Sequence, residues 1–215
     1  GTRRSFLGSV AGGAAAPARV FAPDLESSID FRYAPLQWQS CICFTDYDSH
    51  KSLVGEHGEL RYGHPEINEI VQLTVMGMEQ DELVRQWIEA PGVPIVHTHL
   101  RRPKAHIELI AFATNRPGEG RVDNVILQVT PNAESTVMAQ PVLAFYSKRE
   151  AAIRKEGGRN QILAGGTLLA VASRPFVSRF PDGKAWFFRL RAGELSATTP
   201  LWCFVRLPQE GQDYE

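Results

Sequence analysis

Residues 93–114 read VPIVHTHLRRPKAHIELIAFAT, and this stretch decides the class of fold. Two runs rich in aliphatic residues, 93–100 and 105–114, flank the polar segment 101–104. Apolar runs of this length around a short polar loop predict a β-hairpin with a four-residue turn. We therefore expect a pair of antiparallel strands in the middle of the chain.

Strand-like runs extend on both sides of this hairpin. They are short, rich in β-branched and aromatic residues and separated by turn signals such as Pro-Gly and Asp-Gly, and they occupy residues 36–44, 69–76, 83–90, 125–130, 142–146, 167–173, 185–191 and 201–207. Strands at this density predict a sandwich or a barrel. We expect a single all-β domain, an antiparallel β-sandwich, over residues 36–207.

One segment predicts a helix instead. Ser147 and Glu150 have the spacing of a capping box, the residues that follow favour a helix, and Gly157 and Gly158 form a stop signal. We expect one short surface helix near 148–156, inserted between strands.

The composition of the 215 residues excludes several classes of protein. The 23 Lys+Arg residues are balanced by 24 Asp+Glu, for a net charge of −1, whereas a nucleic-acid-binding protein needs a basic surplus. Three cysteines are too few for a disulfide-built miniprotein, and we expect Cys41, Cys43 and Cys203 to be small buried side chains. The sequence contains no apolar run of 18 residues that would span a membrane.

The first eighteen residues have the features of an export signal. Arg3 and Arg4 precede Phe-Leu and a weakly apolar Gly/Ala stretch, and Ala-Pro-Ala at 16–18 fits a cleavage site. This order is typical of a bacterial twin-arginine signal peptide, although an Ala-rich arm with two chance arginines also accounts for it. We expect residues 1–18 to be the signal, residues 19–35 to lead into the sandwich, and the protein to be periplasmic or extracellular.

Four side chains near the central hairpin are candidate metal ligands. A four-residue turn places His99 opposite His106 and His97 opposite Glu108, on one face of the sheet, with directly opposed Cβ atoms about 5 Å apart. Three imidazoles and a carboxylate at that spacing suit a divalent transition metal. A one-residue change of register instead sends the histidines of the first strand to the other face, and histidines at a hairpin end also suit a solvated rim.

Motifs for other chemistry are absent or incomplete. The sequence has no Gly-x-Ser-x-Gly, Gly-x-Gly-x-x-Gly or P-loop pattern. Glu108 and Asp123 are carboxylates of the kind that glycoside cleavage uses, but the sequence does not place them across a cleft. Four tryptophans in a sandwich are typical of a core, and Trp87 is the candidate for an exposed, sugar-stacking residue. No catalytic residue is assigned.

Six segments carry a resemblance to a known family. They are LQWQSCIC at 36–43, KSLVGEHG at 51–58, VPIVHTHL at 93–100, Glu108 ahead of AFAT at 111–114, DNVILQVTPN at 123–132 and GTLL at 166–169. Together they resemble the N-terminal β-sandwich, or supersandwich, of exported bacterial proteins of glycoside hydrolase or phosphorylase type. In that family the sandwich precedes an (α/α)6 barrel that holds the acid/base residues. The resemblance implies a carbohydrate-linked function with no catalytic residue in this chain.

Two functions from different classes follow as expectations. The first is a non-catalytic β-sandwich module of a larger exported carbohydrate-active protein, which packs on and shapes a catalytic domain, with residues 208–215 as the start of a linker or tail. It implies no cofactor, a following (α/α)6-type domain and a glycan as partners, and no nucleic acid. The alternative is a stand-alone exported metal-binding sandwich or metalloenzyme that uses His97, His99, His106 and Glu108. A pure glycan-binding module is a third option.

Overall fold

The computed structural model describes most of the chain between residues 40 and 209. The described residues are 40–42, 52–62, 70–77, 81–116, 120–132, 137–146, 150–156, 159–183, 185–196 and 198–209. The predicted signal, the entry segment, Cys43 and residues 210–215 of the predicted tail lie outside them. The strands are β1 (Ser40–Cys41), β2 (Ser52–Val54), β3 (Leu60–Tyr62), β4 (Ile70–Val75), β5 (Glu82–Ala90), β6 (Val93–Arg102), β7 (Ala105–Arg116), β8 (Gly120–Pro131), β9 (Val137–Ala139), β10 (Pro141–Tyr146), β11 (Ala152–Glu156), β12 (Arg159–Ala164), β13 (Thr167–Ala172), β14 (Phe176–Asp182), β15 (Ala185–Leu190), β16 (Gly193–Leu195) and β17 (Leu201–Pro208).

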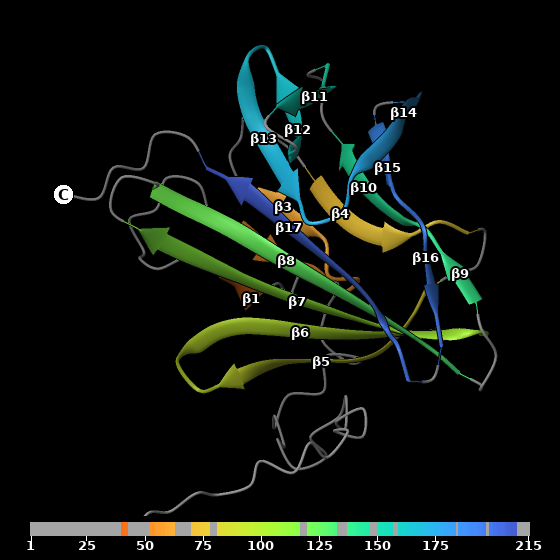
Figure 1. Cartoon of the computed structure of the whole chain (residues 1–215). Helices are drawn as coiled ribbons and strands as arrows, with labels where there is room; N and C mark the ends of the chain where they lie inside the picture. Colours follow the sequence, from red (N-terminus) through yellow and green to blue (C-terminus); the bar gives the residue numbers. More distant parts are fainter. Residues whose placement is uncertain are drawn as a thin grey trace, which may run out of the picture.

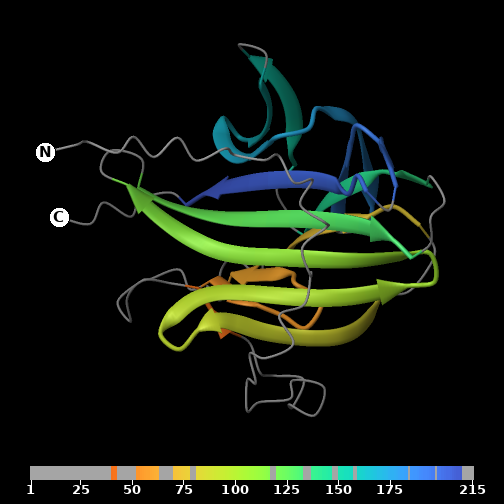
Figure 2. The same ribbon diagram turned by 60° about the horizontal axis from the view of Figure 1, so that its bottom comes forward.

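These strands form two large sheets (Figure 1). The seven-stranded sheet has the order β1-β2-β3-β4-β10-β15-β14, and the eight-stranded sheet has the order β11-β12-β13-β17-β8-β7-β6-β5, while β9 and β16 pair separately. The long strands β5 to β8 lie side by side in the eight-stranded sheet (Figure 2), and neighbouring strands in both sheets run antiparallel. The antiparallel, sandwich-like all-β fold that the sequence predicts is confirmed.

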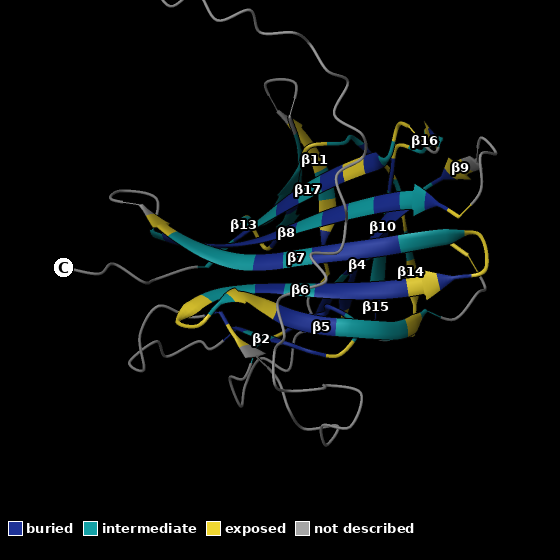
Figure 3. Cartoon of the chain, turned by 90° about the horizontal axis from the view of Figure 1, so that it is seen from below, coloured by how far each residue is buried: buried dark blue, intermediate teal, exposed yellow. Residues whose placement is uncertain are grey.

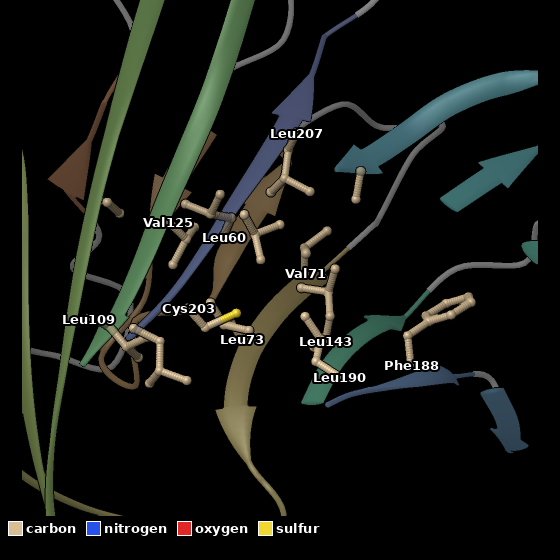
Figure 4. Close-up of a cluster of buried hydrophobic side chains, with 14 of the residues drawn as sticks. Leu60, Val71, Leu73, Leu109, Val125, Leu143, Phe188, Leu190, Cys203 and Leu207 are labelled. Carbon is tan, nitrogen blue, oxygen red and sulfur yellow. The ribbon is translucent and has the colours of Figure 1, made fainter. Parts of the chain in front are cut away.

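The apolar core lies between the two sheets. Leu109 and Val125 point into it from the eight-stranded sheet, and Leu73 and Leu143 from the seven-stranded sheet (Figure 4); each is at most 3% exposed. Fully burying an aliphatic side chain of this kind contributes about 1.5–3 kcal/mol. Figure 3 shows the same burial along the middle of β6 and β7.

The predicted strand positions agree with the structure over most of the chain. Strands occupy every predicted run between residues 69 and 207, with ends shifted by one residue to a few, and β8 begins five residues earlier than predicted. The predicted run 36–44 is described only at residues 40–42, where β1 lies. Sequence analysis did not predict β14, because charged residues and Pro181 interrupt the alternation of apolar and polar side chains in this strand. It also missed the short strands β2, β3 and β9, together with β12 and β16.

The predicted helix near 148–156 is wrong. Residues 152–156 form β11, which pairs with β12 so that Ile153 lies opposite Ile162. An isolated helix of about ten residues is marginal because its nucleation is costly. The hairpin instead lets Ile153 pack on the core beside the fully buried Ile162. In the described part of the chain, no helix is long and apolar enough to cross a membrane.

The central hairpin has a different register from the predicted one. Leu100 pairs with Ile107 rather than with Ala105, and Arg102 lies opposite Ala105. The turn is therefore the two residues 103–104, and β6 continues two residues further than predicted. The shift is an even number of residues, so every side chain keeps its predicted face.

The burial of Arg102 explains why β6 continues. The Arg102 side chain points inward and is only 7% exposed, and its Nη2 donates to Oδ2 of Asp81 at 3.1 Å. Asn132 fixes the turn itself, because its Nδ2 donates to the carbonyl oxygens of Arg102 and Pro103, both at 3.0 Å. A buried ion pair and a distant amide therefore set the turn length, and neither is visible in the hairpin's own sequence.

The cysteines behave in two ways. Cys203 is fully buried, as predicted. Cys41 is exposed, so the prediction that it is buried is wrong. Its strand, β1, lies at the edge of the seven-stranded sheet, where side chains have fewer neighbours than on a central strand.

Candidate functional site

The four predicted metal ligands lie together on the outward face of the eight-stranded sheet. Val96, Thr98 and Leu100 of β6 are buried on the inward face, so the alternating His97 and His99 point outward. The strand pairing places His106 and Glu108 of β7 on this same face, with Glu108 opposite His99 and His106 opposite Arg101. The alternative with the histidines on the opposite face from Glu108 does not occur.

The residues expected to lie opposite each other meet instead on the diagonal. His97 Nδ1 lies 3.0 Å from Oε1 of Glu108, and His99 Nε2 lies 3.3 Å from Nδ1 of His106. Because the register differs by two residues from the predicted one, both contacts join diagonal neighbours across the hairpin. The two predicted contacts, His97 with Glu108 and His99 with His106, are therefore present. The prediction that these residues lie directly opposite each other is wrong.

His97 is held between two carboxylates. Its Nδ1 contacts Glu108, and its Nε2 lies 2.7 Å from Oε2 of Glu89 on β5. Burial alone would lower the pKa of His97, but the hydrogen bonds and charges of Glu108 and Glu89 outweigh it and raise that pKa. When the ring of His97 is protonated, both of its nitrogens donate, and His97 is then the cation of an ion-paired triad.

His99 and His106 have the opposite electrostatics. Burial first, and then the charges of His106 and Arg101, lower the pKa of His99 to about 4. Burial and Arg101 also lower the pKa of His106. Both rings are consequently neutral near pH 7, and they face each other with centroids 5.3 Å apart. A neutral imidazole is the form that coordinates metals.

The four candidate ligands therefore form two pairs with different chemistry. In the described residues, no group of three or more His, Cys, Asp or Glu side chains is arranged to hold a metal ion. Both nitrogens of His97 are directed at carboxylates. Sequence analysis missed Glu89, because it did not predict the pairing of β5 with β6 that sets Trp87 opposite His97 and brings Glu89 to the same face.

Trp87 is not the exposed tryptophan. It is 6% exposed, and its ring stacks on that of His97 with centroids 5.0 Å apart, while Arg85 Cζ lies 5.2 Å from the ring centroid. Trp202 of β17 is 49% exposed on the same outward face, directly opposite Gln128. An accessible indole on this sheet is therefore offered by Trp202, at a position that the sequence alone did not single out.

Asp123 and Glu108 do not form a pair of acids. Asp123 points into the interior and is fully buried, whereas Glu108 points outward from the same sheet. Arg121 donates to Asp123 from Nε and Nη2 at 3.0 and 3.2 Å, and the Ser52 hydroxyl hydrogen-bonds to both residues. Arg121 and Ser52 are also fully buried, so the carboxylate of Asp123 is fixed inside the sandwich.

Tyr62 completes this buried cluster. Burial raises the pKa of Tyr62 well above its ordinary value, and the charge of Asp123 raises it further against the opposing charge of Arg121. Gln209 Nε2 donates to the phenol oxygen at 3.3 Å. Because the cluster joins β2 and β3 of one sheet to β8 of the other, it ties the two sheets together.

A second outward face has an aromatic surface that the sequence did not reveal. Tyr146, Phe187 and Phe180 come from β10, β15 and β14, and their side chains share the outward face of the seven-stranded sheet. The ring centroids of Tyr146 and Phe187 lie 6.2 Å apart, and those of Phe180 and Phe187 5.1 Å apart. Arg189 Cζ lies 4.7 Å from the Phe180 centroid. These four residues are called the outer aromatic cluster below.

One polar atom in the outer aromatic cluster has no partner. Arg189 Nε is buried, and no acceptor in the described part of the chain bonds to it. A buried donor without an acceptor costs about 1–3 kcal/mol. Tyr146 in the same cluster is 39% exposed. The outer aromatic cluster therefore has exposed aromatic surface close to a buried N–H group that lacks a hydrogen-bond acceptor.

No protein-family model matches the chain, and no curated protein matches it either, so its function is argued from the geometry above.

Proposed function

We propose that the chain is a non-catalytic β-sandwich module of an exported carbohydrate-active protein, which packs on and shapes a separate catalytic domain. The observation that carries this proposal is the outer aromatic cluster on the seven-stranded sheet. The resemblance of the sequence to supersandwich domains supplies the class of partner. Two large antiparallel sheets are consistent with that resemblance.

The outer aromatic cluster suits a protein partner. Aromatic residues and arginine are the residue types enriched at the centres of protein interfaces. Phe180 and Phe187 stack almost parallel, with an interplanar angle of 11°. Covering that apolar surface stabilises a complex. The proposed occupant is the catalytic domain of the same polypeptide.

The candidate acids of the described chain support a non-catalytic role. Glu108 and Glu89 hold His97, and Asp123 is enclosed by Arg121. A general acid must reach the substrate, whereas Glu108 and Glu89 are hydrogen-bonded to His97 and Asp123 is fully buried. Catalysis would then come from the partner, with the sandwich fixing the position of the partner's loops.

The test is association with the polypeptide encoded after Glu215. That polypeptide and this chain are produced as two separate proteins and mixed. We expect a 1:1 complex in size-exclusion chromatography with light scattering, and glycoside cleavage or phosphorolysis only in samples containing the second protein. Phe187→Asp should weaken the complex at least about tenfold, equivalent to about 1.4 kcal/mol.

Trp202→Ser is the matched control, because it removes an exposed aromatic residue from the other sheet. It should leave the affinity unchanged. Absence of a coding sequence after Glu215, or a complex that is insensitive to Phe187→Asp, would contradict the proposal.

A further inference from the structure

The pair formed by His99 and His106 has the geometry of two ligands of one metal ion. Zn²⁺ binds imidazole nitrogens at about 2.0–2.1 Å in a tetrahedral arrangement, so two such nitrogens lie about 3.3–3.4 Å from each other. His99 Nε2 and His106 Nδ1 are 3.3 Å apart. An ion placed between them, on the outward side, would satisfy both distances and would replace the contact that the two rings now make.

We propose that His99 Nε2 and His106 Nδ1 form a two-histidine site for a divalent transition metal ion of the Zn²⁺ class, with water in the remaining positions. The proposal goes beyond the docking function, since the site lies on the eight-stranded sheet and the outer aromatic cluster lies on the other sheet. Imidazole ligands suit Zn²⁺, Ni²⁺ and Cu²⁺ better than Mg²⁺ or Ca²⁺.

The surroundings separate this site from His97. Both nitrogens of His97 face carboxylates at 3.0 and 2.7 Å, so that ring serves an ion-paired triad. At His99 and His106, the two nitrogens that would bind the ion are the two that now hydrogen-bond to each other. The metal ligands are therefore two of the three histidines on this face.

The charged side chains beside the site are paired with one another, and the site is accessible from one side. Arg101 lies directly opposite His106, but its guanidinium is held by Glu82 through contacts of 2.8 and 3.1 Å. Glu108 lies directly opposite His99 on the same face and is paired with His97. His99 is 4% exposed while His106 is only half-buried, so an ion reaches the site from the side of His106.

The two ligands are also pre-positioned by the fold. They stand on adjacent, paired strands of the eight-stranded sheet, β6 and β7, with the edge strand β5 on one side and β8 on the other. Sites on paired strands hold their ligands more rigidly than sites on loops. Ordering the ligands therefore adds little entropic cost to metal binding.

The experiment is metal titration of the whole chain, purified without a histidine tag. We expect isothermal titration calorimetry to show one Zn²⁺ per chain. Co²⁺ in place of Zn²⁺ should give the intense visible absorption of four-coordinate cobalt. His99→Ala and His106→Gln should each weaken Zn²⁺ binding at least about tenfold.

Two histidine variants serve as controls. His97→Gln removes the neighbouring ring of the triad, and His57→Ala removes a histidine of the β2–β3 turn whose side chain is 41% exposed. Neither should change the stoichiometry, and the affinity should stay within about twofold. Near-ultraviolet circular dichroism confirms folding, and if His99→Ala does not fold, the half-buried His106→Gln decides the outcome.

Three results would overturn the site. They are absence of stoichiometric Zn²⁺ binding by the unaltered chain, binding that survives in both ligand variants, and a cobalt spectrum typical of six-coordinate, water-bound ions. The docking proposal is tested separately, because Phe187→Asp should leave Zn²⁺ affinity unchanged. Failure of one proposal therefore does not imply failure of the other.

Discussion

The imidazole of His97 lies almost parallel to the indole of Trp87, with an interplanar angle of 9° and centroids 5.0 Å apart. The two residues are direct cross-strand neighbours of β6 and β5. The stack buries a tryptophan on the outward face of a sheet, where the sequence led us to expect an exposed one. It also fixes the plane in which both nitrogens of His97 reach their carboxylates. The stacking on Trp87 and the contacts with Glu108 and Glu89 therefore hold the His97 ring in the same position.

Truncation of Trp87 should be costly. Trp87→Ala removes a side chain that is 6% exposed and leaves His97 without its stacking partner. We expect a loss of about 3–5 kcal/mol in the free energy of unfolding. Urea denaturation, followed by circular dichroism, measures it. Trp202→Ala should change stability by no more than about 0.5 kcal/mol, because that residue is 49% exposed. Equal losses in both variants would show that Trp87 is not buried as described.

The buried pair of Arg121 and Asp123 should be intolerant of losing one partner. Asp123→Asn leaves the fully buried guanidinium of Arg121 without its counter-charge. We expect a loss of about 3–5 kcal/mol, since removal of one partner exposes the whole desolvation penalty of the other. Asp182→Asn is the control at an exposed carboxylate. A loss below about 1 kcal/mol for Asp123→Asn would mean that the two residues do not form a buried ion pair.

Tyr62 should make the fold sensitive to alkali. Its pKa is raised in the folded state, so the protonated phenol favours folding. That contribution is fully present below the unfolded pKa of about 10 and is lost as pH rises through the higher folded pKa. Burial also raises the pKa of Cys203 to about 12, which adds alkaline sensitivity to any variant that keeps the thiol.

The comparison with Tyr62→Phe therefore isolates the phenol. Unfolding free energies measured from about pH 8 to about pH 11 should fall more steeply for the unaltered chain than for Tyr62→Phe. Parallel curves for the two proteins would indicate that the phenol has the same pKa in the folded and unfolded states.

Export should depend on the paired arginines. In the proposed twin-arginine signal, Lys at both Arg3 and Arg4 keeps the charge and removes the pattern that the export pathway recognises. We expect the altered protein to stay in the cytoplasm, while a variant with Lys at positions 154 and 191 in place of arginine is exported normally. Cell fractionation and immunoblotting measure both. Unchanged export of the first variant would favour the interpretation as an Ala-rich arm.

Local patterning explains how much of the fold the sequence predicts. The hairpin of 93–114 alternates so regularly that the outward face of His97 and His99 follows from the period of a strand. The exact pairing does not follow, because Arg102 is drawn inward by Asp81, which is 21 residues away in the sequence. A shift of two residues preserves the faces and changes every direct neighbour.

The remaining differences also arise from long-range contacts. The segment 152–156 has a helical pattern, and the pairing of Ile153 with Ile162 overrides it. The outer aromatic cluster requires β10, β15 and β14 to be neighbours, and Tyr146 is separated by some forty residues of sequence from Phe187. A local sequence pattern does not show which strands are neighbours in a sheet, so the outer aromatic cluster could be recognised only from the structure.

The most direct test of the docking function is to map which face the partner covers. Hydroxyl-radical footprinting of the chain, alone and mixed with the polypeptide encoded after Glu215, reports the solvent access of individual aromatic side chains. We predict that oxidation of Tyr146 and Phe187 falls in the mixture, while oxidation of Trp202 is unchanged. Protection of Trp202 with Tyr146 and Phe187 unaffected, or no protection at any of them, would contradict the function proposed for this fold.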